Sequence, residues 1–288
     1  METNDSNPEH APPPDLSGQR IYVLDSHSLI FQVFHVMPEM TSPSGQPVGA
    51  VYGFTRDLLQ LLEQKQPDYL IAAYDAPGLT FRHDFFPEYK IDREEMPDEL
   101  RPQIPFTQQM CAALGIPVVQ KESFEADDIL ATLARQVEAA GGECILVTGD
   151  KDCRQLITDR VSIYNIRKDE LFDADALQQT WGIRPNQVVD FQGLVGDKTD
   201  GIPGVPLIGP KTATTLLEEY GTLDAVLENA DQIKGKKGQN LQEFREQALL
   251  SRRLATLDAE TPVEVDWSTA RAGQIDQEAA LQLFHELG

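Results

Sequence analysis

Four transitions between apolar and acidic residues mark the first half of this chain. They occur in the segments IYVLD (21–25), YLIAAYD (69–75), SFEADDIL (123–130) and ILVTGDKD (145–152). In three of them an Asp follows a short run typical of a buried strand, and helical patterns separate these runs. Strands that alternate with helices form a mostly parallel sheet, whose carboxyl ends meet at one edge. We therefore expect Asp25, Asp75 and Asp150 to lie near one another at that edge.

The predicted elements alternate up to about residue 173. Apolar runs predict strands at 21–24, 69–74, 116–119, 143–148 and 161–166, and helical periodicity predicts helices at 26–37, 49–64, 103–114 and 125–140. The segment 76–103 is aromatic, charged and proline-rich, and irregular segments of this length are usually functional or disordered. After residue 173 the pattern is helical. The predicted fold class is therefore α/β, with a mostly parallel sheet flanked by helices and a second, helical region.

These patterns divide the chain into four parts. Residues 1–20 are acidic and proline-rich and predict a disordered tail, and residues 21–173 predict the α/β domain that carries the candidate site. Residues 174–265 predict a helical region, and residues 266–288 predict a linker that ends within an amphipathic pattern. Because this last apolar pattern stops abruptly, we expect the natural chain to continue.

Composition restricts the location and the partners. The chain is 41% hydrophobic and 25% charged, as in globular proteins, and no apolar run reaches the roughly 18–20 residues of a membrane helix. Its three cysteines form no CxxC or Cys/His pattern, so we predict free thiols and a cytoplasmic protein. The net charge of −23 counts against a simple nucleic-acid binder. Bound cations would offset this charge locally, and basic residues cluster at 81–93, at Lys211 and at 233–245.

Nine carboxylates make up the candidate site: Asp25, Asp75, Glu125, Asp127, Asp128, Asp150, Asp152, Asp197 and Asp200. Carboxylate oxygens are hard ligands that suit Mg²⁺ and Mn²⁺, and two such ions close together stabilise both oxygens of a phosphoryl displacement. Each acid also has a plainer explanation as a helix cap, a first-turn residue or a turn residue. The repeated acids at 125–128, 150–152 and 197–200 exceed what caps and turns need. They predict a two-metal phosphodiesterase.

Two further segments indicate contact with a nucleic-acid backbone. The segment GIPGVPLIGPKT (201–212) predicts a hairpin between helices, with backbone N–H groups and a helix N-terminus available to phosphates at Gly204, Gly209, Lys211 and Thr212. In the long loop, Lys90 and Arg93 are candidates for holding the scissile phosphate, and aromatic residues including Tyr89 are candidates for stacking on bases. Taken alone, the loop is better explained as a mobile segment with inward-packed aromatic residues. No Walker A, HExxH or GxSxG motif offers another chemistry.

With these residues in place, the chain resembles a known family, the 5′-nuclease domains of bacterial DNA polymerase I, which are relatives of flap endonucleases. The most specific matches are GQPVGAVYGF (45–54), the FR, YK and R pattern of 81–93, EADD (125–128), TGDKD (148–152) and GDKTDGIPGVPLIGPKTA (196–213). The resemblance runs from about Ile21 to the C-terminus, and all nine carboxylates match the metal-ligand positions of the family.

The resemblance implies a PIN-like sheet, a helical arch at 80–103 with Lys90 and Arg93 acting on the phosphate, and a helix-hairpin-helix that grips duplex DNA and commonly holds K⁺. It also implies two Mg²⁺ ions, for which Mn²⁺ would substitute. One ion is then expected on Asp25, Asp75, Glu125 and Asp127. The other is expected on Asp127, Asp150, Asp152 and Asp197, with Asp127 bridging the two ions. Asp128 and Asp200 are expected to act through water.

The implied activity is that of a structure-specific 5′-3′ exonuclease and 5′-flap endonuclease. Its substrates would be DNA with 5′ ends or flaps and RNA primers, in primer removal and DNA repair, and the ending LFHELG resembles the start of a connection to a polymerase. Two positions depart from the family pattern, Gln32 where Arg is usual and Gly201 where Asn is usual. A PIN-type ribonuclease and a non-catalytic module that binds branched DNA are the alternatives.

Overall fold

The computed structural model describes residues 14–288, so most of the tail predicted for 1–20 lies outside the described residues. The part that is described is ordered. Leu16 is fully buried, and its backbone N–H donates to the carbonyl oxygen of Ala140 at 2.9 Å. The predicted tail therefore extends too far, because the apolar side chain of Leu16 packs into the core before the first strand begins.

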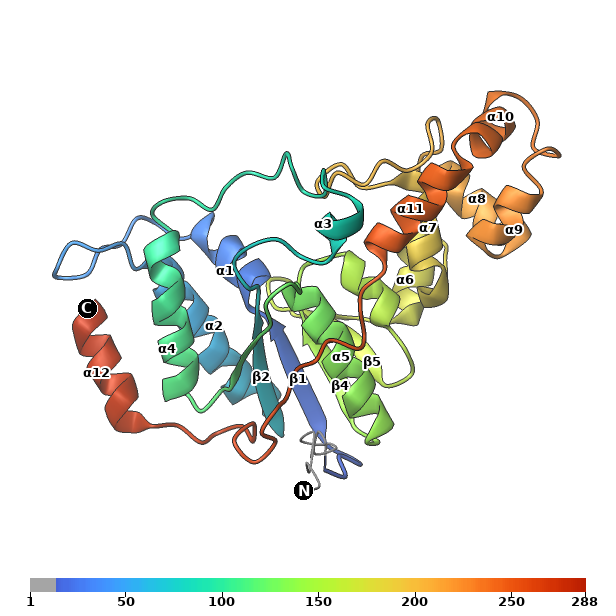
Figure 1. The fold of residues 1–288 in the computed structure, drawn as a ribbon. Coiled ribbons are helices and arrows are strands. Elements are labelled where there is room, and N and C mark those ends of the chain that lie inside the picture. The colour runs from blue at the N-terminus through green and yellow to red at the C-terminus, as the bar shows by residue number, and fades with distance from the viewer. Residues whose placement is uncertain (1–13) are drawn as a thin grey trace, which may run out of the picture.

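A six-stranded sheet forms the centre of the first half (Figure 1). Its strand order is β3-β2-β1-β4-β5-β6, and every pairing is parallel except that of β6 with β5. The strands are β1 (Arg20–Asp25), β2 (Tyr69–Tyr74), β3 (Val118–Gln120), β4 (Glu143–Val147), β5 (Val161–Asn165) and β6 (Glu170–Phe172). The predicted α/β class is confirmed. Strand β6 was not predicted, because three partly exposed residues give no strand periodicity.

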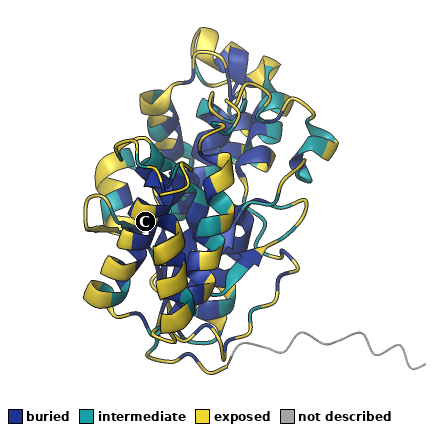
Figure 2. Ribbon diagram, turned by 90° about the vertical axis from the view of Figure 1, so that its left-hand side faces the viewer, coloured by how far each residue is buried: buried dark blue, intermediate teal, exposed yellow. Residues whose placement is uncertain are grey.

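The strands are buried on both sides, and successive residues of β1 serve different cores. Ile21 and Val23 pack with helix α5 (Ala126–Ala139) on one face. Tyr22 and Leu24 pack on the other face, which is covered by helices α1 (Ser26–Phe34), α2 (Gly49–Lys65) and α4 (Ile104–Ala113). Figure 2 shows the buried interior between helices whose outer sides are exposed. Since both faces are covered, the carboxyl edge of the sheet is the side on which a ligand meets the strands.

The segment expected to be a helical arch contains little helix. Between residues 80 and 103 only α3 (Arg82–Phe85) and the 3₁₀ turn η1 (Arg101–Gln103) are helical. Pro87, Pro97 and Pro102 interrupt the segment, and each proline disfavours helix in the residue before it. In Figure 1 the chain from α3 to α4 crosses above the ends of β1 and β2. The segment from α3 to α4 therefore crosses the carboxyl edge of the sheet as an irregular loop, and we call it the crossing segment.

The second half is helical and has a core of its own. It comprises α6 (Ala174–Trp181), η3 (Pro185–Gln187), α7 (Val188–Val195), α8 (Pro210–Tyr220), α9 (Leu223–Glu228), α10 (Lys236–Glu243) and α11 (Arg245–Ala255). Leu194, Leu217 and Leu223 are among its buried residues. The turn η2 (Asp152–Leu156) leads out of β4 and lies against α7. The helical half is therefore attached close to the carboxyl end of β4.

The last segment returns to the α/β half. Trp267 packs edge-on against Tyr69, with ring centroids 5.8 Å apart, and helix α12 (Gln277–Leu287) lies against α4. The residues predicted to form a linker are thus packed onto the domain, because Trp267 and the apolar face of α12 are buried there. In the part of the chain that the structure describes, no helix has the length and apolar character needed to cross a membrane.

Candidate metal centre

A cavity of about 310 Å³ lies at the carboxyl edge of the sheet, and Lys90 and Arg93 from the segment that follows α3 are among its lining residues. Six of the nine predicted acids line it: Asp25, Asp75, Glu125, Asp127, Asp150 and Asp200. Lys90 and Arg93 line it as well, together with His27, Gln32 and His35. The structure therefore brings together acids and bases that are up to 175 positions apart in the sequence (200 − 25).

Asp25 ends β1 and caps α1 at the same time. One carboxylate oxygen accepts the N–H of Ser28 at 3.0 Å, and the other accepts the hydroxyl of Thr148 at 2.7 Å. The plainer explanation of this acid, as the start of a helix, is thus correct but incomplete. The cap fixes the carboxylate in the floor of the cavity, where it is only 5% exposed.

Asp75 and Asp127 are brought into the same cavity from different elements. Asp75 follows β2, and its carboxylate accepts the N–H of Ala126 at 2.7 Å, which ties it to the first turn of α5. Asp127 stands in that first turn, and the thiol of Cys153 lies 3.4 Å from its Oδ1. The N-terminus of α5 therefore aligns two predicted ligands, since Asp75 accepts a hydrogen bond from its first residue and Asp127 belongs to its first turn.

Glu125 is held by groups from the crossing segment. Its carboxylate accepts hydrogen bonds from Lys90 Nζ at 2.9 Å and from the hydroxyl of Tyr89 at 3.2 Å. Tyr89 is only 4% exposed and packs with Ile202 and Leu254, which fits the inward-packed alternative for the aromatic residues of this loop better than stacking on bases. Its aromatic ring packs inward because that buries apolar area, and its hydroxyl finds a partner in Glu125.

Lys90 joins the crossing segment to the helical half. Its backbone is left-handed, with φ of 55°, a conformation that is costly for a residue with a side chain. Its N–H donates to the carbonyl oxygen of Asp200 at 3.1 Å, and its ammonium lies 3.7 Å from the Asp200 carboxylate. The strained conformation places one cation between the carboxylates of Glu125 and Asp200.

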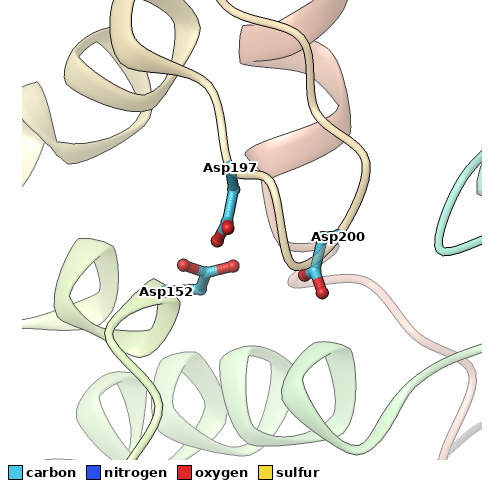
Figure 3. A group of neighbouring side chains, drawn as sticks. All are labelled: Asp152, Asp197 and Asp200. Carbon is cyan, nitrogen blue, oxygen red and sulfur yellow. The ribbon is translucent and has the colours of Figure 1, made fainter. Parts of the chain in front are cut away.

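Three acids form a second group beside the cavity, shown in Figure 3. Asp152, Asp197 and Asp200 each offer an oxygen, and these atoms lie within 4.8 Å of one another. Asp152 is fixed by Gln192, whose side-chain amide donates to its Oδ1 at 2.5 Å. Carboxylates that face one another at this spacing fit a hard divalent cation. The acidic cluster is therefore able to hold a metal ion.

Several of these acids resist ionisation. Burial, followed by the nearby charge of Asp75, raises the pKa of Asp25 to about 7. Burial and the charge of Asp150 raise the pKa of Asp152 to about 7 as well. The pKa of Asp127 is also raised, by burial and by Asp25 and Asp150. Crowded carboxylates of this kind are stabilised by a bound cation, which favours their ionised form.

Asp128 points elsewhere. Both of its oxygens accept hydrogen bonds from the guanidinium of Arg82, at 2.7 and 2.8 Å, and the side chain is fully buried. It also accepts the N–H of Glu125 at 3.1 Å and that of Asp258 at 2.9 Å. These contacts do not fit the predicted role of Asp128 as an outer metal ligand. One position along α5 turns a side chain by about 100°, so Asp127 and Asp128 face different surroundings.

The predicted hairpin has one end whose backbone is accessible to a phosphate and one end whose backbone is buried. Gly204 is buried, and its N–H donates to the Ser251 hydroxyl at 3.0 Å, so this N–H is not available to a phosphate. Gly209 is exposed at the start of α8 and Lys211 is exposed in its first turn, while the Thr212 hydroxyl accepts from Lys237 at 2.9 Å. The open N-terminus of α8 has two lysines beside it and suits an anionic group.

The two departures from the family pattern differ in their effect on the charge of the site. Gly201 has φ of 69°, in the left-handed region that both Gly and Asn tolerate, so this exchange preserves the turn. Gln32 lines the cavity, and its amide donates to Ser28 at 3.1 Å, so a neutral group stands where a cation is usual. Only the second departure alters the charge of the site.

Four supporting residues were not predicted from the sequence: Arg82, Lys151, Cys153 and Gln192. Arg82 holds Asp128, Lys151 lies 2.5 Å from Asp197, Cys153 contacts Asp127 and Gln192 fixes Asp152. Arg82 and Lys151 belong to motifs that the sequence analysis quoted, the FR pair and TGDKD. Cys153 and Gln192 carry no motif signal, since their partners are distant in sequence.

Comparison with known proteins assigns both halves of the chain to 5′-3′ exonuclease domains. Residues 20–182 match the family model of the 5′-3′ exonuclease N-terminal resolvase-like domain, and residues 183–278 match that of the 5′-3′ exonuclease C-terminal SAM fold. DNA polymerase I of Bacillus subtilis is 37% identical over 275 residues, which cover 94% of this chain and 31% of the relative. The chain thus spans about a third of the length of this curated relative.

Solved structures share the fold. A zinc-bound T5 5′-exonuclease superposes with a TM-score of 0.72 at 21% identity, covering 93% of this chain and 99% of that one. The catalytic core of Rad2 in complex with DNA substrate gives 0.60 at 17% identity, covering 96% of this chain and 90% of that one. At these identities the structures show the fold alone. The two family models, matched in order along the chain, show that this protein belongs to the 5′-3′ exonuclease family.

Proposed function

We propose that this protein is a structure-specific 5′-3′ exonuclease and 5′-flap endonuclease that hydrolyses phosphodiester bonds of DNA. One observation carries the proposal: acids from the ends of β1, β2 and β4 and from the first turn of α5 line one cavity with Lys90 and Arg93. Family membership supports the same reaction. The uses in primer removal and repair, and a polymerase portion in the same longer chain, are further parts of the proposal.

The proposed ligands fall into two groups that share Asp127. Asp25, Asp75, Glu125 and Asp127 would hold one Mg²⁺, for which Mn²⁺ would substitute. Asp127, Asp150, Asp152 and Asp197 would hold the second, with Asp200 beside them. Of these acids, Asp152, Asp197 and Asp200 have oxygens within 4.8 Å of one another. When bound, such a pair supplies a hydroxide-like nucleophile at neutral pH and stabilises the leaving oxygen. Asp128 is left out of the ligand set because Arg82 and two backbone N–H groups occupy its oxygens.

The basic residues have a separate task in the proposed reaction. Lys90, placed between Glu125 and Asp200, would contact the scissile phosphate and stabilise charge that develops there. Arg93 lines the cavity and would hold the phosphate in register. The open N-terminus of α8 with Lys211 would bind the phosphate backbone of the duplex without reading bases. A K⁺ ion at this hairpin rests on the sequence resemblance alone, and so do RNA primers as substrates and a cytoplasmic location.

The experiment that tests the proposal is cleavage of a 5′-labelled flap on duplex DNA, with Mg²⁺ and then with EDTA. We expect metal-dependent release of products near the flap junction. The matched control is Asp150→Asn, which should bind the flap with normal affinity and cut it at no measurable rate. Flap binding without cleavage in Mg²⁺ and Mn²⁺ would favour the non-catalytic binding module. Cleavage of unstructured RNA with no need for a duplex would favour a PIN-type ribonuclease.

A further inference from the structure

A lysine lies within the second acidic group. Lys151 follows Asp150, and its Nζ lies 2.5 Å from Oδ2 of Asp197. The lysine side chain is 42% exposed, whereas that of Asp197 is 7% exposed. A half-exposed ammonium therefore reaches a buried carboxylate that belongs to the proposed second metal site. Figure 3 shows this carboxylate pointing toward Asp152, with Asp200 beside the two.

The second acidic group needs positive charge when no metal is bound. Its three carboxylates have oxygens within 4.8 Å of one another, and like charges at that spacing repel one another strongly. Lys90 supplies positive charge 3.7 Å from Asp200, and Lys151 supplies it 2.5 Å from Asp197. The side chain of a lysine is an ammonium ion at neutral pH, so Lys151 places a positive charge beside the buried carboxylate of Asp197.

Lys151 is not required to position Asp197. The other oxygen of that carboxylate accepts the N–H of Thr199 at 2.9 Å. The backbone of Asp197 is paired with Ile202 by two hydrogen bonds, of 2.8 and 2.7 Å. These contacts hold the carboxylate in place without the lysine. The ammonium therefore adds positive charge at a carboxylate that is already positioned, and this carboxylate is one of the three that could hold a metal ion.

We propose that Lys151 is a tethered cation that competes with the second divalent ion for Asp197 and so sets the metal concentration at which the second site fills. The inference rests on the proposed nuclease function and concerns the regulation of that same site. A metal ion can bind Asp197 only in the molecules in which Lys151 has moved away. The apparent affinity for the metal is therefore the intrinsic affinity multiplied by the fraction of such molecules. The half-exposed side chain leaves the site by rotating toward solvent.

The test measures Mn²⁺ binding to the protein without DNA, by electron paramagnetic resonance of the free ion. Lys151→Gln removes the charge, and we expect the weaker class of sites to bind roughly tenfold more tightly. Lys151→Arg keeps the charge, and the matched control Lys168→Gln removes a charge in the turn between β5 and β6. Both should stay within about threefold of the wild type. In EDTA, Lys151→Gln should have a lower Tm than the wild type, because the carboxylates lose a cation.

Two results would overturn the inference. One is a weaker class in Lys151→Gln whose affinity equals or falls below that of the wild type, which would make the lysine a support for the site. The other is a single class of sites in both proteins, which would leave nothing to compete for. Flap cleavage by the wild type is measured separately, so a failure of the nuclease proposal is distinguishable from a failure of the competition.

Discussion

Arg82 and Asp128 form a two-hydrogen-bond ion pair beneath the candidate metal centre, with side chains that are 1% and 0% exposed. The guanidinium also donates to the carbonyl oxygens of Leu254 and Thr256, at 3.0 and 3.1 Å. One pair thus connects the crossing segment, helix α5 and the chain that leaves α11. The acid next to Asp127 serves the fold, while Asp127 itself faces the cavity.

This difference predicts opposite effects of one substitution at adjacent positions. Asp128→Asn leaves Arg82 buried without its charged partner and should lower the free energy of unfolding by about 3 kcal/mol. Asp127→Asn removes a carboxyl whose pKa is raised by burial and like charges, so the metal-free protein should keep or gain stability. Urea denaturation in EDTA measures both. Equal losses in the two variants would contradict the assignment.

The raised pKa values predict how stability depends on pH. Asp25 and Asp152, with pKa values of about 7 in the folded protein, bind protons more tightly there than in the unfolded chain, where the pKa is about 4. Between these values the folded state holds more protons, so stability falls as pH rises from about 4 to about 7. The metal-free Tm should decrease over this range, and Mg²⁺ should restore it at pH 8. A Tm that rises with pH in EDTA would refute this account.

Lys90 and Lys211 should affect different steps of turnover. Lys90→Ala removes the cation between Glu125 and Asp200 and should slow single-turnover cleavage about 100-fold at saturating DNA. Lys211→Ala should leave that rate unchanged, weaken flap binding, and reduce the salt dependence of binding by about one counterion. Rapid-quench kinetics and binding titrations at several salt concentrations separate the two effects. If the two variants shared one phenotype, the division of roles would be wrong.

Gln32 offers a gain-of-function test. Gln32→Arg places a cation in a cavity wall where the family usually has one, and it should lower KM for a flap substrate several-fold at low salt. The gain should shrink as salt rises, since an exposed phosphate contact is screened. Gln32→Leu, which has similar volume and no charge, is the control. An unchanged KM at every salt concentration would show that this position does not reach the DNA.

Much of the site could be predicted because the end of a strand can be recognised from a few neighbouring residues. An apolar run followed by Asp predicted that Asp25, Asp75 and Asp150 would meet, and all three line the cavity. The alternation of strands and helices likewise predicted the parallel sheet, and the structure confirms it.

The sequence could not show which way a side chain points or which residues far away in the chain it contacts. In EADD the spacing does not tell which acid faces the metal, and only the packing of Arg82 on Asp128 decides it. Tyr89 illustrates the same limit, since an aromatic residue near a lysine suits either a base or a core, and Ile202 and Leu254 provide the core. The pairing of Lys151 with Asp197 spans 46 residues (197 − 151) and leaves no periodic trace.

The boundary between the two matched family domains, at residues 182 and 183, divides the nine carboxylates of the candidate site. Seven of the nine acids precede it, and Asp197 and Asp200 follow it. Neither matched domain therefore contains the group of Asp152, Asp197 and Asp200 by itself. A hybrid that joined the first domain of one relative to the second domain of another would have to keep Asp152 close to Asp197 and Asp200 for this group to form.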